Sequence, residues 1–276
     1  MSTRPSPYPG AQAVSRAVAV LKAFTDARPH LTLAEVARAT RLNRATAYRL
    51  LAALEHEGLI ARASDDGYHL GSEAIVLGGR ALRANDVRAA SRPELERLAH
   101  ATQEAATLEV LAPPDILVLD EVLSPHLIAG APILGTRWPA HATSTGKAIL
   151  AHQPDTAVAA FLKAAVNRQT LPRFTERTLT TPAAFQRELA AARERGYATV
   201  QDELEVGYAA VAAPVLDYDG RALAALCLGG PTVRLTTARL TEVAPLVLQA
   251  ARRVSQQLGY RAPSAARRAP RAARGS

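Results

Sequence analysis

Two helix starts that lie close together are the feature that most constrains the fold of this chain. Thr32 is followed three residues later by Glu35, which is the capping-box pattern of a helix N-terminus. Leu31 and Val36 occupy the positions of a hydrophobic staple across the same start. Asn43 supplies a second N-cap, so the first of the two helices must be short. The pattern predicts a short helix, a tight turn and a second helix in immediate succession.

The second of these helices has two unlike faces. Its sequence, NRATAYRLLAALEHEG, repeats apolar residues at helical spacing and ends at Gly58. The opposite face carries small residues, a tyrosine and arginines. A helix that reads the major groove needs this combination, because small residues allow close approach and Arg pairs with guanine or phosphate. The residues predicted to bind DNA are Thr32, Asn43, Arg44, Ala45, Thr46, Tyr48 and Arg49.

The flanking segments complete a DNA-binding pattern. Apolar residues at helical spacing predict an amphipathic helix over residues 13–26. After Gly58, the segment LIARASDDGYHLG indicates a hairpin, because Asp66-Gly67 is a tight-turn signal between two apolar pairs. Three helices and a hairpin over residues 12–71 predict a winged helix-turn-helix domain. A small helical bundle with no role in DNA binding is the alternative.

Charge is distributed unevenly along the 276 residues, whose formal net charge is +8. Residues 1–90 hold 12 Lys and Arg against 8 Asp and Glu, whereas residues 91–260 hold 16 against 17. Residues 261–276 hold 5 Arg and no acid, and they mix Arg with Ala, Pro and Ser, so we expect a disordered basic tail. Basic segments attract polyanions such as nucleic acid, although a biased genome also produces Arg- and Ala-rich composition.

Composition excludes several classes of protein. No stretch approaches the ~20 continuous apolar residues that a membrane helix needs, and the N-terminus MSTRPSPYPGAQ lacks the apolar region of a secretory signal. Cys227 is the single cysteine, so one chain can form neither a disulfide framework nor a cysteine metal cluster. We expect a soluble cytoplasmic protein with no membrane partner, no cofactor and no metal.

The remaining residues predict an α+β domain. Residues 72–91 indicate a helical linker, and a helix with Pro93 at its favourable first position opens the second domain, residues 92–260. TLEVLA and DILVLDEV are strand-like segments split by Pro113-Pro114, and AAVAAPVLDYDGRALAALCLGG contains two strands around Asp219-Gly220. Helical segments lie before, between and after these strands. We therefore expect an antiparallel sheet with helices packed on it.

One stretch, HATSTGKAIL at residues 141–150, contains parts of two enzyme motifs. A phosphate loop has glycine where His141 stands and a hydroxyl where Ala148 stands, so that match fails at both ends. A nucleophile pair of the Ser-x-x-Lys type would use Ser144 and Lys147 one helical turn apart, but its companion motifs Ser-Asp-Asn and Lys-Thr-Gly are absent. We expect no enzymatic activity, and a serine acyl-transfer enzyme using Ser144 and Lys147 is the alternative function.

These segments together resemble the IclR family of bacterial transcriptional regulators over about residues 12–258. The matching phrases are AVSRAVAVLKAF, LTLAEVARATRLNRATAYRLLAALEHEGLI and YHLG in the first domain, and HATSTGKAILA and RGYATVQDELEVGYAAVAAPVLDYDGRALAALCLGGP in the second. Their shared order and spacing make the resemblance specific. One departure is Arg41, which stands in the turn where the family usually has Gly. Glycine suits a left-handed helix end, and Arg there costs up to about 1 kcal/mol.

The resemblance implies a GAF-like sensor domain joined to the winged helix-turn-helix domain. It also implies a homodimer or tetramer on palindromic operator DNA, and a small-molecule effector that is commonly a carboxylate. HATSTGKAIL corresponds to the loop and helix start that line the effector pocket, where hydroxyl groups and backbone N–H groups favour an anion. The resemblance implies that the effector-binding residues are Ser144, Thr145, Gly146, Val200, Asp202, Ala210, Cys227 and Gly229. Lys147 follows the first three in the same stretch and would also face the ligand.

The strand residues of this set suggest the kind of effector. Val200, Ala210, Cys227 and Gly229 are apolar, small or weakly polar where glyoxylate- or pyruvate-type relatives have polar groups. This favours a larger or less polar organic acid, and an aromatic acid is one candidate. Two plainer interpretations stay open. Ser144 and Thr145 can cap a structural helix, and Cys227 can be a buried small hydrophobe, which is the usual state of cysteine.

Overall fold

The computed structural model describes residues 11–25, 27–63, 66–126, 133–166 and 170–261. The chain divides between Ala84 and Asn85 into two compact units, and each unit has a hydrophobic core of its own. The predicted basic tail lies outside the described residues except for Arg261. No helix in the described part of the chain combines the length and the hydropathy that a membrane crossing requires.

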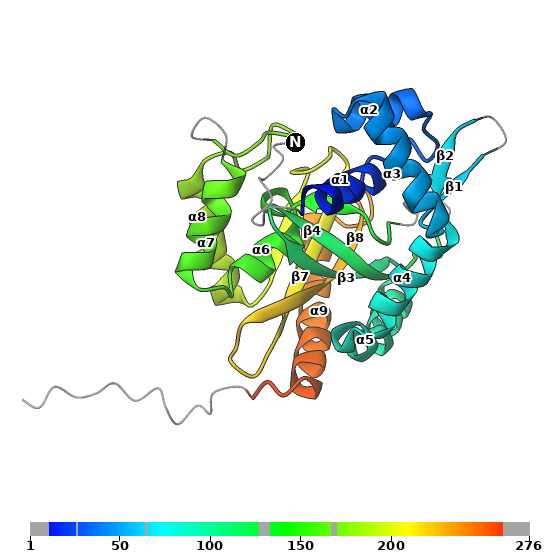
Figure 1. The fold of residues 1–276 in the computed structure, drawn as a ribbon. Helices are drawn as coiled ribbons and strands as arrows, with labels where there is room; N and C mark the ends of the chain where they lie inside the picture. The colour runs from blue at the N-terminus through cyan, green and yellow to red at the C-terminus, as the bar shows by residue number, and fades with distance from the viewer. Residues whose placement is uncertain (1–10, 26, 64–65, 127–132, 167–169, 262–276) are drawn as a thin grey trace, which may run out of the picture. The chain divides into compact units, whose positions relative to one another are not determined.

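In its described residues, the first unit has three helices, a two-stranded hairpin and a fourth helix (Figure 1). These elements are α1 (Gln12–Leu21), α2 (Leu33–Thr40), α3 (Arg44–His56), β1 (Ile60–Arg62), β2 (Tyr68–Leu70) and α4 (Ser72–Arg83). The apolar faces of α1, α2 and α3 meet the hairpin in one core. Its buried residues are Val20, Phe24, Leu31, Val36, Leu51, Leu54, Ile60 and Tyr68. The arrangement is a winged helix-turn-helix domain, as the two caps and the hairpin signal predict.

Two boundaries in this unit differ from the prediction. Helix α1 ends at Leu21 rather than near residue 26, because the backbone N–H groups of Ala23 and Phe24 bond three residues back and Thr25 then bridges Arg28. Phe24 is nevertheless buried, so the apolar pattern continued past the end of the helix. The wing is wider than a two-residue turn. Ala63 N donates to Gly67 O at 2.8 Å, and Asp66 has a left-handed φ of 59°.

The second unit is built on an antiparallel sheet whose strand order, in the described residues, is β5-β4-β3-β8-β7-β6 (Figure 1). The strands are β3 (Ala105–Ala112), β4 (Asp115–Val122), β5 (Arg137–Pro139), β6 (Ala198–Gln201), β7 (Tyr208–Leu216) and β8 (Ala222–Pro231). Both predicted hairpins are present. One joins β3 to β4 through Pro113-Pro114, and the other joins β7 to β8 through Asp219-Gly220.

Helices cover both faces of this sheet. The long helices α5 and α9 pack on one face over an apolar core that includes Leu108, Val211 and Leu226. The other face meets α6, with α7 and α8 beside it, over a second core that contains Cys227 and Phe185. The helical elements are α5 (Asp86–Thr102), the 3-10 turn η1 (Ala140–Ala142), α6 (Ser144–Leu150), α7 (Asp155–Ala165), α8 (Pro182–Arg195) and α9 (Thr237–Gln257). The predicted α+β class with an antiparallel sheet is confirmed.

The segment predicted as a linker is not one helix. Helix α4 ends at Arg83, and α5 starts at Asp86 with Asn85 as its N-cap, since Asn85 Oδ1 accepts a hydrogen bond from Arg88 N at 2.9 Å. Pro93 therefore lies inside α5 rather than at its first position, and that prediction is wrong. Packing outweighs the missing N–H, because the turns after Pro93 bury their apolar side against the sheet.

Candidate functional site

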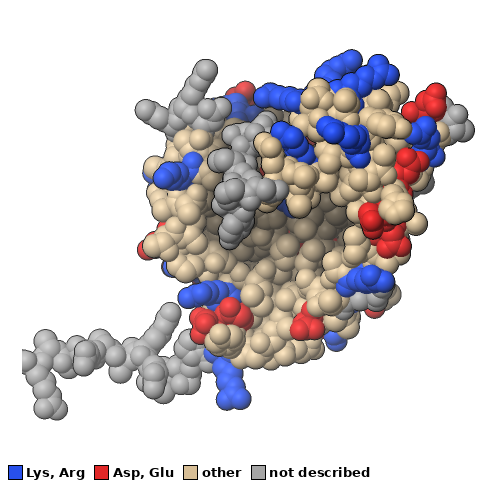
Figure 2. Space-filling model, viewed as in Figure 1, with Lys and Arg blue, Asp and Glu red and all other residues tan. Residues whose placement is uncertain are grey.

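The first candidate site is the solvent-facing side of α3. Ala47, Leu51 and Leu54 are buried, so the helix turns its opposite side outward, and Tyr48 is 51% exposed there. The other exposed residues of this side include Arg44, Ala45 and Arg49. Lys and Arg side chains gather on the surface that α1 to α3 form (Figure 2). This side therefore offers guanidinium donors and small side chains around one half-exposed aromatic ring.

Three of the residues predicted to bind DNA fix the starts of the two helices. Thr32 Oγ1 accepts from Glu35 N at 3.4 Å and donates to Glu35 Oε2 at 2.8 Å, while Thr32 N donates to the same carboxylate oxygen at 2.8 Å. The backbone hydrogen bond from Thr32 lowers the pKa of Glu35. Asn43 Oδ1 accepts from Thr46 N at 2.8 Å. Thr32, Asn43 and Thr46 thus position the exposed side of α3.

The turn between α2 and α3 is closed by Arg41 in a left-handed conformation, with φ 57° and ψ 33°. Leu42 N donates to Ala37 O at 3.0 Å across this turn, which is the hydrogen bond of a Schellman helix end. A left-handed residue is what the family resemblance implies at this position. Here an arginine adopts the left-handed conformation, which glycine would adopt without strain.

The second candidate site lies on one face of the sheet in the second unit. Strand pairing aligns Val200 with Ala210 across β6 and β7, and Ala210 with Gly229 across β7 and β8. The neighbouring row aligns Cys227 with Thr107 across β8 and β3. Cross-strand partners share a face, and residues two apart on a strand share it too. The four strand residues implied by the resemblance therefore lie together on a floor of small side chains.

Helix α6 packs against this floor. All of its residues are buried, and Ser144 Oγ lies 3.5 Å from Cys227 Sγ on β8. Burial, and after it the nearby Glu109 carboxylate, raise the pKa of Cys227 to about 12, so the thiol is neutral near pH 7. Thr145 is also buried, and its hydroxyl lowers the pKa of both Cys227 and Glu109. The structure thus brings Ser144, Thr145 and Cys227 together.

Two polar side chains that were not predicted from the sequence lie beside Ser144, Thr145 and Cys227. Glu109 is only 6% exposed, and its Oε1 accepts a hydrogen bond from Thr107 Oγ1 at 2.6 Å. Burial raises the pKa of Glu109. A signal existed in the segment TLEVLA, where Thr107 and Glu109 alternate with apolar residues at the period of a strand. Because both faces of this strand are covered, the alternation marks a buried polar row rather than a solvent-exposed one.

Tyr208 is another member that the sequence did not suggest. It opens β7, and burial raises its pKa well above the usual value. A Cβ atom on Gly229 would lie 2.2 Å from Tyr208 Oη, so glycine makes room for the phenol over the floor. The buried polar cluster, as the term is used below, consists of Thr107, Glu109, Ser144, Thr145, Tyr208 and Cys227.

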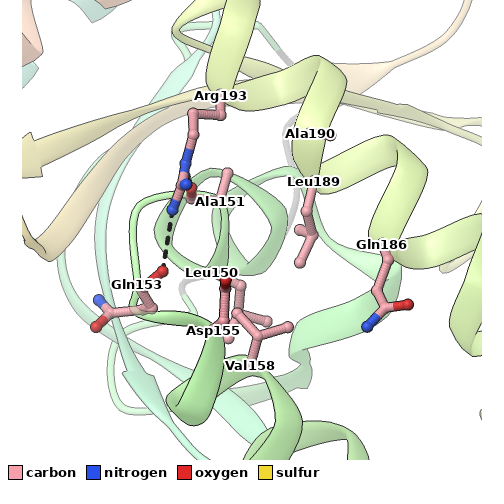
Figure 3. A pocket seen from close by; sticks show the side chains of 9 residues that line it. All are labelled: Leu150, Ala151, Gln153, Asp155, Val158, Gln186, Leu189, Ala190 and Arg193. Atoms are coloured by element: carbon pink, nitrogen blue, oxygen red, sulfur yellow. Dashed lines mark hydrogen bonds between the residues drawn. The ribbon is translucent and has the colours of Figure 1, made fainter.

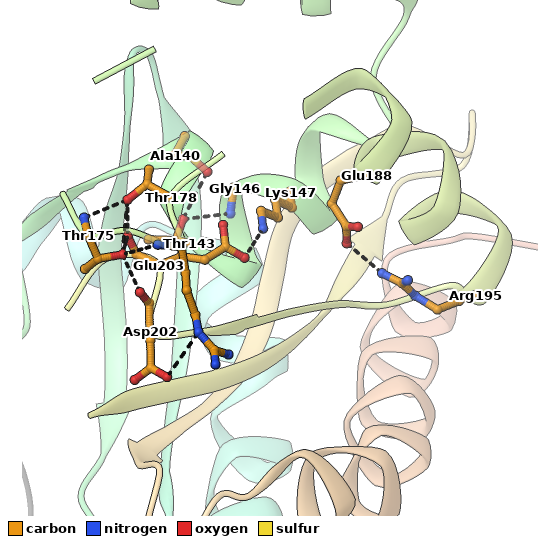
Figure 4. Close-up of polar contacts among 11 residues, drawn as sticks. Ala140, Thr143, Gly146, Lys147, Thr175, Thr178, Glu188, Arg195, Asp202 and Glu203 are labelled. Carbon is orange, nitrogen blue, oxygen red and sulfur yellow. Dashed lines mark hydrogen bonds and ion pairs between the residues drawn. The ribbon is translucent and has the colours of Figure 1, made fainter. Parts of the chain in front are cut away.

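Gly146 and Lys147 have structural contacts of their own (Figure 4). A Cβ atom on Gly146 would lie 2.0 Å from Ala140 O, so glycine allows α6 to cross η1 closely. Thr143 is the N-cap of α6, because its Oγ1 accepts from Gly146 N at 3.1 Å. The interpretation that Ser144 and Thr145 cap the helix is therefore wrong. Their hydroxyl groups are not the ones that hold the helix start.

Lys147 and Ser144 do not form a nucleophile pair. Lys147 is 1% exposed, and its Nζ lies 2.5 Å from Glu203 Oε1 in a buried ion pair (Figure 4). Ser144 instead contacts Cys227. A serine nucleophile needs its general base within hydrogen-bond reach of its own hydroxyl. Lys147 is committed to Glu203, so the arrangement supports the structure of the domain rather than acyl transfer.

Asp202 lies at a loop rather than in the buried polar cluster. It has a left-handed φ of 59°, and its Oδ1 accepts from Gly207 N at 2.7 Å, which closes the loop between β6 and β7. Its other carboxylate oxygen lies 3.9 Å from Arg177 Nε, and its carbonyl accepts from Thr175 (Figure 4). Of the residues implied by the resemblance, Asp202 is thus the one whose side chain shapes the adjoining loop.

A cavity of about 310 Å³ lies elsewhere, where the end of α6 meets α7 and α8 (Figure 3). Arg193 reaches across it and donates to Ala151 O and, at 3.0 Å, to Gln153 O. Its lining residues are Leu150, Ala151, Gln153, Asp155, Val158, Gln186, Leu189, Ala190 and Arg193. None of these belongs to the buried polar cluster, so this cavity and the cluster are separate features.

Both units of the chain match models of known protein families. The family model of the IclR helix-turn-helix domain matches residues 13–64, and the model described as the C-terminal part of the bacterial transcriptional regulator IclR matches residues 79–256. The HTH-type transcriptional regulator BhcR of Paracoccus denitrificans (strain Pd 1222) is 34% identical over 247 residues, which cover 89% of this chain and 87% of that protein.

Solved structures agree with this result. The IclR transcriptional regulator of Alicyclobacillus acidocaldarius has a TM-score of 0.81 and 27% identity, and the match covers 91% of this chain and 100% of that one. An IclR homolog from Microbacterium hydrocarbonoxydans, complexed with 4-hydroxybenzoate, has a TM-score of 0.77 and 27% identity over 90% of this chain and 99% of that one. The relatives are transcriptional regulators and not enzymes. This chain belongs to the IclR family of bacterial transcriptional regulators and binds DNA through its winged helix-turn-helix domain.

Proposed function

We propose that this regulator reads operator DNA with the exposed side of α3 and that a small organic acid, bound in the buried polar cluster, controls this binding. Arg44, Ala45, Tyr48 and Arg49 face the groove in this proposal. Thr32, Asn43 and Thr46 hold the helix starts that present them. A palindromic operator requires symmetric copies, so we also propose a homodimer or tetramer, which sedimentation of the protein with and without operator would test.

The DNA half of the proposal is tested with Arg44→Ala and Arg49→Ala. The probe is a duplex that the wild-type protein selects from random sequences. Loss of an arginine that reads a base is expected to cost ~1–3 kcal/mol and to relax sequence preference, whereas loss of a phosphate contact weakens all sequences alike. Arg187→Ala, an exposed arginine of α8, is the matched charge control. Normal binding by both α3 variants at moderate salt would contradict the assignment.

The observation that carries the effector half is the buried polar cluster itself. Buried polar groups are normally paired, and a group of hydroxyl, thiol and carboxyl side chains inside an apolar core needs a reason. Hydroxyl donors at Ser144 and Thr145 suit a carboxylate ligand. The floor formed by Val200, Ala210 and Gly229 offers flat apolar surface for a ring. In this proposal Tyr208, which is partly buried and lies over Gly229, moves to admit the effector.

The protonation state of Glu109 determines whether the buried polar cluster can bind an acid. An ionised Glu109 would repel an effector carboxylate in the same buried site. Burial raises the pKa of Glu109, so this group holds a proton more readily than an exposed carboxyl does. In its protonated form Glu109 donates a hydrogen bond to the effector. The Microbacterium relative in complex with 4-hydroxybenzoate supports an aromatic carboxylate as the effector class.

Calorimetric titration with 4-hydroxybenzoate tests this half. We expect Ser144→Ala and Thr145→Val each to weaken binding by ~1–2 kcal/mol, the scale of a lost buried hydrogen bond, while binding of DNA without effector stays near wild type. The operator response then shifts about five- to thirty-fold to higher effector concentration. Thr241→Val, on the exposed side of α9, is the control for Thr145→Val.

The alternatives predict other results. A structural role lowers the melting temperature and leaves effector affinity unchanged, and a catalytic role gives turnover of a generic ester that Ser144→Ala abolishes. Unchanged affinity in both variants would disprove the proposed site. Failure of the wild-type protein to bind 4-hydroxybenzoate, together with binding of a smaller aliphatic acid, would replace the aromatic class by an aliphatic one.

A further inference from the structure

We infer that Arg41 is itself a DNA-binding residue, whose guanidinium binds a backbone phosphate beside the groove that α3 enters. The inference rests on the proposed function in one respect, namely that α3 is the helix that enters the groove. It adds a contact from the turn, outside the helix that presents Arg44 and Arg49. Three observations carry it: the backbone conformation of Arg41, the surroundings of its side chain, and its place between α2 and α3.

The backbone of Arg41 is in a region that L-residues with a long side chain adopt at a cost. Its φ of 57° and ψ of 33° close the end of α2, and the hydrogen bond from Leu42 N to Ala37 O requires only the backbone. Glycine would form the same turn without strain, and asparagine with little. The geometry of the turn therefore does not explain why this position carries an arginine. Strained residues are concentrated at functional sites, which justifies the inference from an observed outlier to a function.

The side chain of Arg41 has no internal role in the part of the chain that the structure describes. The residue is exposed, and its guanidinium forms neither a hydrogen bond nor an ion pair with a described residue. The carboxylate of Glu35, at the start of α2, is held by Thr32. An arginine that stabilised the turn would bind such an acceptor. The donors of Arg41 are therefore available to an acceptor outside the protein.

The position of Arg41 identifies that acceptor. In a helix-turn-helix domain the first helix crosses the DNA backbone, and the N-terminal residues of the second reach into the major groove. The turn between them consequently lies at the edge of the groove, where phosphates are. Exposed Arg38 in the last turn of α2 and Arg44 in the first turn of α3 flank Arg41 on the two sides. Guanidinium is well matched to phosphate, because its planar fork donates two parallel hydrogen bonds.

The experiment compares Arg41→Gly, Arg41→Asn and Arg41→Lys with wild type, using the duplex selected by the wild-type protein and a random duplex. We expect Arg41→Gly to raise the melting temperature and yet to weaken binding of both duplexes several-fold. The slope of log affinity against log salt should fall by about one unit, because one phosphate contact is lost. Arg41→Asn should weaken binding similarly, and Arg41→Lys should retain most of the affinity and the slope. Arg187→Gln is the control for a lost positive charge.

Several outcomes would overturn the inference. Wild-type affinity and salt slope in Arg41→Gly and Arg41→Asn would mean that the arginine contacts no DNA. Weaker binding in Arg41→Gly with full binding in Arg41→Asn would point to rigidity of the turn instead of charge. A selective loss on the preferred duplex would make Arg41 a base-reading residue and not a phosphate contact. Arg44→Ala and Arg49→Ala, measured in parallel, show separately whether the α3 face is the DNA interface.

Discussion

A buried carboxyl group lowers stability when it is ionised, and Glu109 is such a group. Its partner in the structure is the neutral hydroxyl of Thr107, at 2.6 Å. Burial raises the pKa of Glu109 in the folded protein above its pKa in the unfolded chain. Between these two pKa values, folded Glu109 retains a proton that the unfolded chain has already lost. The stability of the wild-type protein therefore falls as the pH rises through that window. A neutral side chain of the same shape avoids this loss.

Glu109→Gln should accordingly stabilise the protein, and the gain should depend on pH. We expect the free energy of unfolding of the variant to exceed that of wild type on the order of 1 kcal/mol at about pH 8, with the difference shrinking towards about pH 5. Urea denaturation across this range measures the difference. Glu194→Gln, at an exposed site on α8, should show no such trend. A difference for Glu109→Gln that is equal at every pH would contradict the assignment of the shift to this carboxyl.

At the scale of secondary-structure elements, glycine has opposite roles in two helices. Gly146 lies in α6, where a Cβ atom would meet Ala140 O at 2.0 Å, whereas Gly78 lies in α4 with open space around it. Alanine is the better helix former by roughly 0.5–1 kcal/mol in a helix interior. The local preference is thus the same at both positions, and only the packing of α6 against η1 differs.

We expect Gly78→Ala to raise stability by about 0.5–1 kcal/mol and Gly146→Ala to lower it by ~1–3 kcal/mol, because an overpacked crossing must shift backbone. Differential scanning calorimetry of the two variants measures both effects. Gly146→Ala should also weaken the effector response, since α6 carries Ser144 and Thr145. An increase in stability in both variants would show that α6 can move away from η1 without cost, against the close packing described.

At the scale of the whole molecule, positive charge is concentrated at the two ends of the chain. Truncation after Tyr260 removes 5 Arg and no acid. We expect folding and operator preference to survive, while nonspecific DNA affinity falls and loses part of its salt dependence, because fewer counterions are released. Fluorescence anisotropy with a random duplex over a salt series measures this change. Loss of assembly after truncation would instead assign a structural role to residues 261–276.

Local sequence signals were sufficient to predict several elements of the fold. Thr32 with Glu35 and Asn43 predict where α2 and α3 start, and the apolar spacing of α3 predicts which side is exposed, because caps and periodicity act within a few residues. The hairpin at Asp219-Gly220 was predictable for the same reason. The left-handed turn at Arg41 followed instead from the family resemblance, since glycine is usual at that position. Together with the ordered motifs, these signals were enough to predict the class of both units and the family.

Other features depend on contacts between residues that are distant in the sequence. Pro93 lies inside α5 because packing against the sheet outweighs one lost hydrogen bond. Thr107 meets Cys227 because β3 pairs with β8, although these strands lie far apart in the sequence. Lys147 binds Glu203, so a motif that suggests chemistry is an internal ion pair. Such contacts follow from burial and strand pairing over the whole chain, for which no local signal exists, and only the folded molecule could specify them.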